Sequence, residues 1–203
     1  MNGLQRGVAR TETQIQGEDM TAVYGNKGAE LSRVDAGVAA QRRALQRVMI
    51  GHGALMIATA LLGGVGLWMF LLGGFEIIPG YIIHFQLPGS AEGWRKAHSG
   101  PVLNGLMVIG IAFALPLLDF KISTARILGW IIVLDGWSNV GFYVFGNLSP
   151  NRGLAFGSSV MGPSNIYSVL ALGPAYLFGV LATGALFIIG WHAIAGMGRS
   201  GDD

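Results

Sequence analysis

The stretch 48-VMIGHGALMIATALLGGVGLWMFLLG-73 decides the fold class of this chain. It carries no Asp, Glu, Lys or Arg, and it exceeds the about 20 residues that a helix needs to cross the hydrocarbon core of a bilayer. Three further segments are apolar and long enough as well, at 98–118, 127–147 and 167–195. The sequence therefore predicts an all-α integral membrane protein whose protomer is a four-helix bundle embedded in a lipid bilayer.

The composition excludes the main water-soluble classes. Apolar side chains make up 52% of the 203 residues and charged ones 12%, whereas soluble domains carry about 25% charge. So few charges cannot cover the surface of a soluble globule, which excludes a cytoplasmic enzyme and a nucleic-acid-binding protein. The chain has no cysteine, so disulfides, thiolate ligands and covalent haem attachment are excluded, and any cofactor must be held non-covalently.

The hydropathy and charge patterns divide the chain into four parts. Residues 1–33 are polar and lack a helical period, which predicts a disordered N-terminal extension. Residues 34–47 are Ala-rich and basic and predict a helical lead-in. Residues 48–196 are expected to form the four-span transmembrane domain, and 197–203 a short C-terminal tail.

Basic residues beside the spans predict the orientation. If the N-terminus is inside, more of them lie on the cytoplasmic side, as the positive-inside rule requires. On that side are Arg42, Arg43, Arg47, Lys121, Arg126 and Arg199, against Arg95, Lys96 and Arg152 outside. Both termini are therefore expected to be cytoplasmic.

The third span carries a polar stripe. Asp135, Asn139 and Tyr143 are spaced i, i+4 and i+8, which puts them on one helical face. Polar groups inside a membrane are costly unless they meet a partner, a cavity or a cofactor. Two interpretations stay open: hydrogen bonds that join neighbouring helices, and a functional pocket.

The second span offers His98, followed by Pro101 and Asn104. Because proline is tolerated near a helix start, His98 is expected in the first turn. Its imidazole could be an interfacial side chain, a proton carrier or a metal ligand. His98 and Asn104 differ by about 120° around the helix, so if both serve one kind of site, that site is expected between protomers.

Three further histidines are weaker candidates for a functional role, and a stripe of small residues concerns helix packing. His52, His84 and His192 occupy positions that close packing or interface anchoring explains. Small residues on the fourth span predict close helix contacts, either at an oligomer interface or only within one protomer. This stripe consists of Ala171, Ala175, Gly179 and Thr183.

Several long runs resemble one family. They include GHGALMIATALLGGVGLWM, GGFEIIPGYII, EGWRKAHSGPVLNGLM and IIVLDGWSNVGFYVFGNLSPNRGL. In this order they are similar to the bacterial styrene oxide isomerases, over about residues 45–195. The match consists of long, uncommon strings and not of one short pattern.

The resemblance implies a homotrimeric enzyme of the bacterial inner membrane that acts in styrene degradation. Such an enzyme converts styrene oxide, a small aryl epoxide, to phenylacetaldehyde by a Meinwald rearrangement, with non-covalent ferric haem b at the subunit interface as Lewis acid. By the same resemblance, His98 corresponds to the axial iron ligand, and Asn104 and Tyr143 to the groups that position the epoxide oxygen. Asp135 and Asn139 are expected to orient Tyr143 or a ring N–H.

One alternative is a b-haem electron-transfer subunit of a respiratory complex, which is also small, helical and free of cysteine. Such subunits usually bind iron on both faces, and the sequence places no second spanning histidine well opposite His98. A small-solute transporter is expected to show internal repeats, which this sequence does not have.

Overall fold

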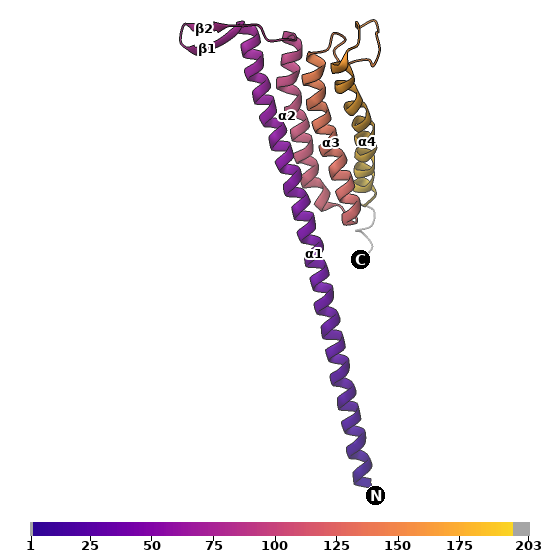
Figure 1. Cartoon of the computed structure of the whole chain (residues 1–203). Helices are drawn as coiled ribbons and strands as arrows, with labels where there is room; N and C mark the ends of the chain where they lie inside the picture. The colour runs from indigo at the N-terminus through magenta and orange to yellow at the C-terminus, as the bar shows by residue number, and fades with distance from the viewer. Residues whose placement is uncertain (1, 197–203) are drawn as a thin grey trace. The chain divides into compact units, whose positions relative to one another are not determined.

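A computed structural model describes the backbone of residues 2–196 and the side chains of residue 30 and residues 32–196. The predicted tail at 197–203 lies outside the described residues. Figure 1 shows four long helices and a short hairpin. These helices are long and apolar enough to cross a membrane, so the expected helical fold with four helices of spanning length is confirmed, while its assembly as a trimer stays a prediction.

Helix α1 extends over Asn2–Leu72, which differs from the disorder predicted for residues 1–33. That prediction relied on the missing hydrophobic period, which detects a helix only when the helix packs an apolar face, and no proline interrupts the hydrogen bonds of α1. The first proline of the chain is Pro79. Chain contacts separate two compact units, Met1–Arg43 and Ala44–Asp203, and the other predicted domain limits remain predictions.

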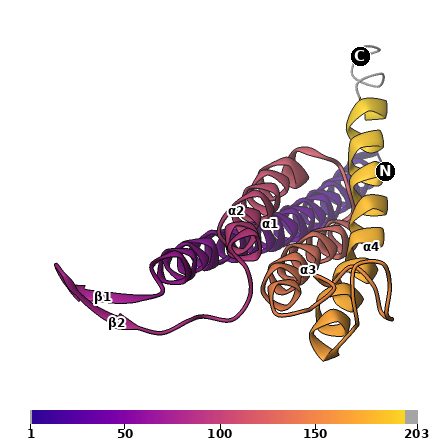
Figure 2. The same cartoon turned by 90° about the horizontal axis from the view of Figure 1, so that it is seen from above.

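A β-hairpin follows α1. Gly73 ends the helix with a φ of 65°, a conformation that glycine adopts without strain. Strands β1 (Gly74–Ile78) and β2 (Tyr81–His84) then pair antiparallel. Seen from above, the hairpin projects away from the helices of its unit (Figure 2).

Helix α2 begins at Ala91, seven residues before the predicted start of the second span, and ends at Ala114. Ser90 caps it by accepting a hydrogen bond from the amide of Gly93. The expectation that His98 lies in the first turn is therefore wrong: His98 lies two turns inside α2, and Pro101 is internal. The prediction failed because the first turns of α2 are polar, and hydropathy does not distinguish a polar helix from a loop.

The remaining helices complete the core of the second unit. A short 3-10 helix, η1 (Leu115–Leu117), leads to α3 (Ile122–Asn147), and α4 covers Ile166–Gly196. Helix α3 packs against both α2 and α4, as Figure 1 shows. The largest fully buried apolar side chains of this core are Met49, Met56, Val108, Ile132 and Val133.

Candidate active site

His98 lies on the face of α2 that meets α1. Its Nδ1 is 2.9 Å from the carbonyl oxygen of Ala60, a buried residue of α1. The residue is otherwise exposed on the surface of the single chain. The Nδ1 of His98 therefore contacts α1, while the rest of the side chain lies at the surface of the protomer.

Tyr143 and Asn104 lie on a different side of α2, toward α3. The ring of Tyr143 covers Gly100 so closely that a Cβ at position 100 would collide with it. Asn104 follows Gly100 by one helical turn and so shares its face. Among the described residues, the Nδ2 of Asn104 is buried and has no hydrogen-bond partner. A buried donor of this kind requires an explanation, and a bound oxygen atom is one.

The two parts of the candidate site do not meet within one chain. His98 contacts α1, whereas Gly100, two residues later, contacts Tyr143 of α3. Two residues correspond to about 200° around a helix. The side chains that the sequence assigned to one kind of site are therefore divided between two sides of α2.

Asp135 and Asn139 meet each other, as their spacing predicts. The Nδ2 of Asn139 donates to Oδ1 of Asp135 at 3.2 Å and to its carbonyl oxygen at 3.1 Å. Asp135 is buried at the contact with α4, near Gly179. Within the part of the chain that the structure describes, no hydrogen bond joins either residue to Tyr143, so the expected orienting role remains a prediction.

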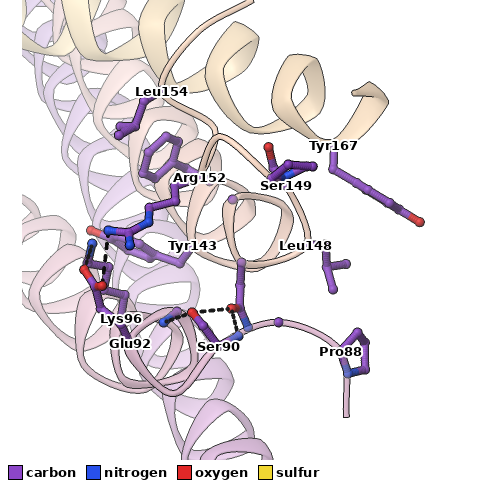
Figure 3. A pocket seen from close by; sticks show the side chains of 16 residues that line it. Pro88, Ser90, Glu92, Lys96, Tyr143, Leu148, Ser149, Arg152, Leu154 and Tyr167 are labelled. Carbon is purple, nitrogen blue, oxygen red and sulfur yellow. Dashed lines mark hydrogen bonds and ion pairs between the residues drawn. The ribbon is translucent and has the colours of Figure 1, made fainter. Parts of the chain in front are cut away.

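A cavity of about 610 Å³ opens where α2 begins and α3 ends (Figure 3). This volume is within the range of about 300–1,000 Å³ that small-molecule sites occupy. Its lining combines aromatic with polar side chains, among them Glu92, Phe142, Tyr143, Asn147, Arg152 and Tyr167. Tyr143 therefore borders both Gly100 and a space large enough for a small organic molecule.

Polar contacts join the elements around this cavity. Asn147, the last residue of α3, accepts a hydrogen bond from the amide of Ser90, the N-cap of α2, at 2.9 Å. Glu92 is 2.9 Å from Lys96 and 3.2 Å from Arg152 (Figure 3). Exposed ion pairs stabilise a fold only weakly, and the Arg152–Glu92 contact joins the loop after α3 to α2.

A buried polar network holds that loop in place. Asn151 and Ser168 are fully buried, and Ser149 contacts them at 2.7 Å and 2.6 Å through its hydroxyl group. Beside them, Arg152 has a φ of 60°, which is uncommon for a residue with a side chain. The network therefore fixes the backbone from which Arg152 reaches Glu92.

The other spanning histidines have partners of their own. The Nδ1 of His52 accepts from the indole N–H of Trp137 at 3.1 Å. His192 stacks on Phe120 with ring centroids 4.1 Å apart. In the described residues, no group of three or more His, Cys, Asp or Glu side chains could hold a metal ion.

Sequence reasoning missed the groups in α1 that contact His98. Ala60 acts through its backbone carbonyl, which every residue possesses, so no pattern marks it. Gly64 lies against the His98 ring, and its signal was the glycine-rich run 63-GGVG-66. Glycines in a membrane helix mark places where another chain segment approaches closely.

Comparisons with known proteins agree on one family. A family model described as styrene oxide isomerase matches residues 45–194. A curated protein from Pseudomonas fluorescens, named styrene-oxide isomerase, is 63% identical over 155 residues, which are 76% of this chain and 92% of that protein.

Proposed function

This chain belongs to the styrene oxide isomerase family and is an isomerase, and on that premise we propose that it converts styrene oxide to phenylacetaldehyde by a Meinwald rearrangement. We further propose non-covalent ferric haem b as its cofactor, with His98 as the axial ligand. The observation that carries the site assignment is the buried amide of Asn104, which lacks a partner among the described residues, on the face of α2 that Tyr143 covers.

His98 fits an iron ligand by its hydrogen bonding. Histidines that bind a metal through one ring nitrogen usually donate the other N–H to a carbonyl or carboxylate. The contact between Nδ1 of His98 and the Ala60 carbonyl is of this kind. Bound ferric haem supplies a Lewis acid for the epoxide oxygen.

Asn104 and Tyr143 supply the donors for the epoxide oxygen. An amide N–H and a phenolic O–H both donate, and both residues border the face around Gly100. Donors that are already oriented stabilise the negative charge that develops on oxygen as the ring opens. Their role is thus to bind the oxygen in the position that the reaction requires.

The rearrangement needs no atom or electron from outside the substrate. The benzylic C–O bond breaks, a hydride moves from the terminal carbon to the benzylic carbon, and the terminal carbon becomes the carbonyl. The aryl ring stabilises the cationic carbon during this shift. Water would trap the same carbon as a diol, and a site among apolar membrane helices limits that side reaction.

Assembly as a homotrimer brings the two sides of α2 into one site. In a cyclic trimer each interface joins different faces of two neighbours. In that arrangement His98 of one protomer would hold the haem, and Asn104 and Tyr143 of the next would bind the epoxide oxygen. This proposal includes the inner membrane as the location, with both termini on the cytoplasmic side.

Deuterium labelling tests the reaction itself. Styrene oxide with two deuterium atoms on the terminal carbon is expected to give phenylacetaldehyde with one deuterium on the formyl carbon and one on the benzylic carbon. The measurement is mass spectrometry of early product from membranes that contain the full chain. A diol product, or a benzylic position filled from solvent at the earliest times, contradicts the proposed hydride shift.

Co-expression tests whether the site is shared between chains. A His98→Ala chain and a Tyr143→Phe chain each lack one half of the site. If neighbouring protomers supply the halves, about a quarter of the sites in randomly mixed trimers are intact, so about a quarter of wild-type activity is expected. Activity no higher than the sum of the two variants alone indicates a site within one protomer.

A further inference from the structure

Two glycines of α1 lie directly against α2 at the level of His98. A Cβ added to Gly64 would lie 2.7 Å from the Nδ1 and 2.9 Å from the Cε1 of His98. A Cβ added to Gly63 would collide with the carbonyl oxygen of Ala97. The imidazole therefore packs directly against the backbone of α1, and any side chain at position 64 would displace the ring.

Pro101 leaves one backbone carbonyl of α2 without its helical donor. In a regular helix the amide of residue 101 would donate to the carbonyl of Ala97, but proline has no N–H. The freed Ala97 carbonyl faces Gly63 of α1. A Cβ at position 63 would collide with this carbonyl, so glycine at position 63 permits the close approach of α1 to α2 beside His98.

The carbonyl of Ala60 selects one tautomer of His98. A backbone carbonyl only accepts hydrogen bonds, so the contact of 2.9 Å requires the proton on Nδ1. In the neutral ring, Nε2 then carries a free lone pair. Ala60 lies four residues before Gly64, one turn away on the same face of α1.

We infer that Gly64 and the Ala60 carbonyl are positioning groups for His98. Gly64 provides the space for the ring, and the carbonyl holds its Nδ1–H, so that Nε2 is presented as a stronger and oriented donor toward iron. This inference rests on the proposed function, in which His98 binds haem.

Gly64→Ala is the primary test, made in the full chain in native membranes. The apparent haem affinity is expected to fall about 10- to 100-fold, the loss typical when a group that orients a metal-binding histidine is disturbed. The iron–histidine stretching band of the reduced protein is expected to shift or disappear in resonance Raman spectra. Both readouts are independent of isomerase activity.

Gly66→Ala is the matched control. Its new Cβ would collide with the ring of Trp94, one turn from His98, so it disturbs the same helix contact without touching the imidazole. Gly51→Ala, where no atom lies within 4 Å of the new Cβ, controls for the substitution itself. If Gly66→Ala changes haem affinity and the stretching band as much as Gly64→Ala does, the effect is one of packing and the inference is wrong.

A measurement on the wild-type protein covers the case in which Gly64→Ala does not accumulate. In the diamagnetic ferrous–CO form, the Nδ1–H of His98 is expected as a resolved, slowly exchanging proton resonance. Rapid exchange of that proton overturns the inference. Wild-type protein without haem, or His98→Ala protein that keeps it, contradicts the proposed function instead, so the two failures are distinguishable.

Discussion

Replacement of His98 by alanine is expected to remove haem and isomerase activity together. A chain without cysteine has no thiolate to replace the imidazole, and the axial ligand holds the iron of a non-covalent haem. The measurements are the Soret absorbance per chain and the rate of phenylacetaldehyde formation. Added imidazole is expected to restore part of both, because the truncated side chain leaves space for the free ligand.

Two other histidines serve as controls for this result. His52→Ala and His192→Ala are expected to keep the Soret band, because their rings are engaged by Trp137 and Phe120. His98→Ala protein with a normal Soret band and normal activity, together with His52→Ala protein that has lost both, would contradict the axial assignment. The shared-site geometry would then have to be abandoned.

Replacement of Tyr143 by phenylalanine is expected to lower kcat on the order of 10²-fold, the effect of removing one oriented donor from a developing oxyanion. The phenylalanine ring retains the packing on Gly100, so haem content and thermal stability are expected to change little. Turnover of styrene oxide and the Soret absorbance, measured on the same preparation, separate these effects.

Tyr176→Phe is the matched control, because Tyr176 is exposed on α4 and also loses only a hydroxyl group. Its turnover is expected to equal that of the wild type. An unchanged rate for Tyr143→Phe would assign Tyr143 to helix packing alone. Parallel loss of haem and rate in Tyr143→Phe would indicate a role in cofactor retention.

Hydropathy was sufficient to locate the four spans. The predicted fourth span, 167–195, differs from α4 by one residue at each end, and the first ends within a residue of Leu72. These segments are apolar along their whole length, and backbone groups in a membrane must be satisfied within the helix. The sum of residue hydropathies therefore determines the type of such an element, and its length where the whole helix is apolar.

Hydropathy did not predict where a helix starts when its first turns are polar. Helix α2 begins at Ala91 because Ser90 caps it and because Asn147, 57 residues away, accepts from the Ser90 amide. The local sequence contained the cap, but the apolar pattern began only at His98. A cap works through a few hydrogen bonds, whose signal is small beside that of twenty apolar residues.

The sequence by itself determined which side chains are candidates: His98, Asn104 and Tyr143 follow from their residue types and their place in apolar segments. Only the tertiary structure decided what each of them meets. His98 contacts the carbonyl of Ala60, 38 residues away, and Tyr143 covers Gly100. These contacts depend on how closely two helices approach, and that distance is set by packing between segments remote in sequence, which no local pattern encodes.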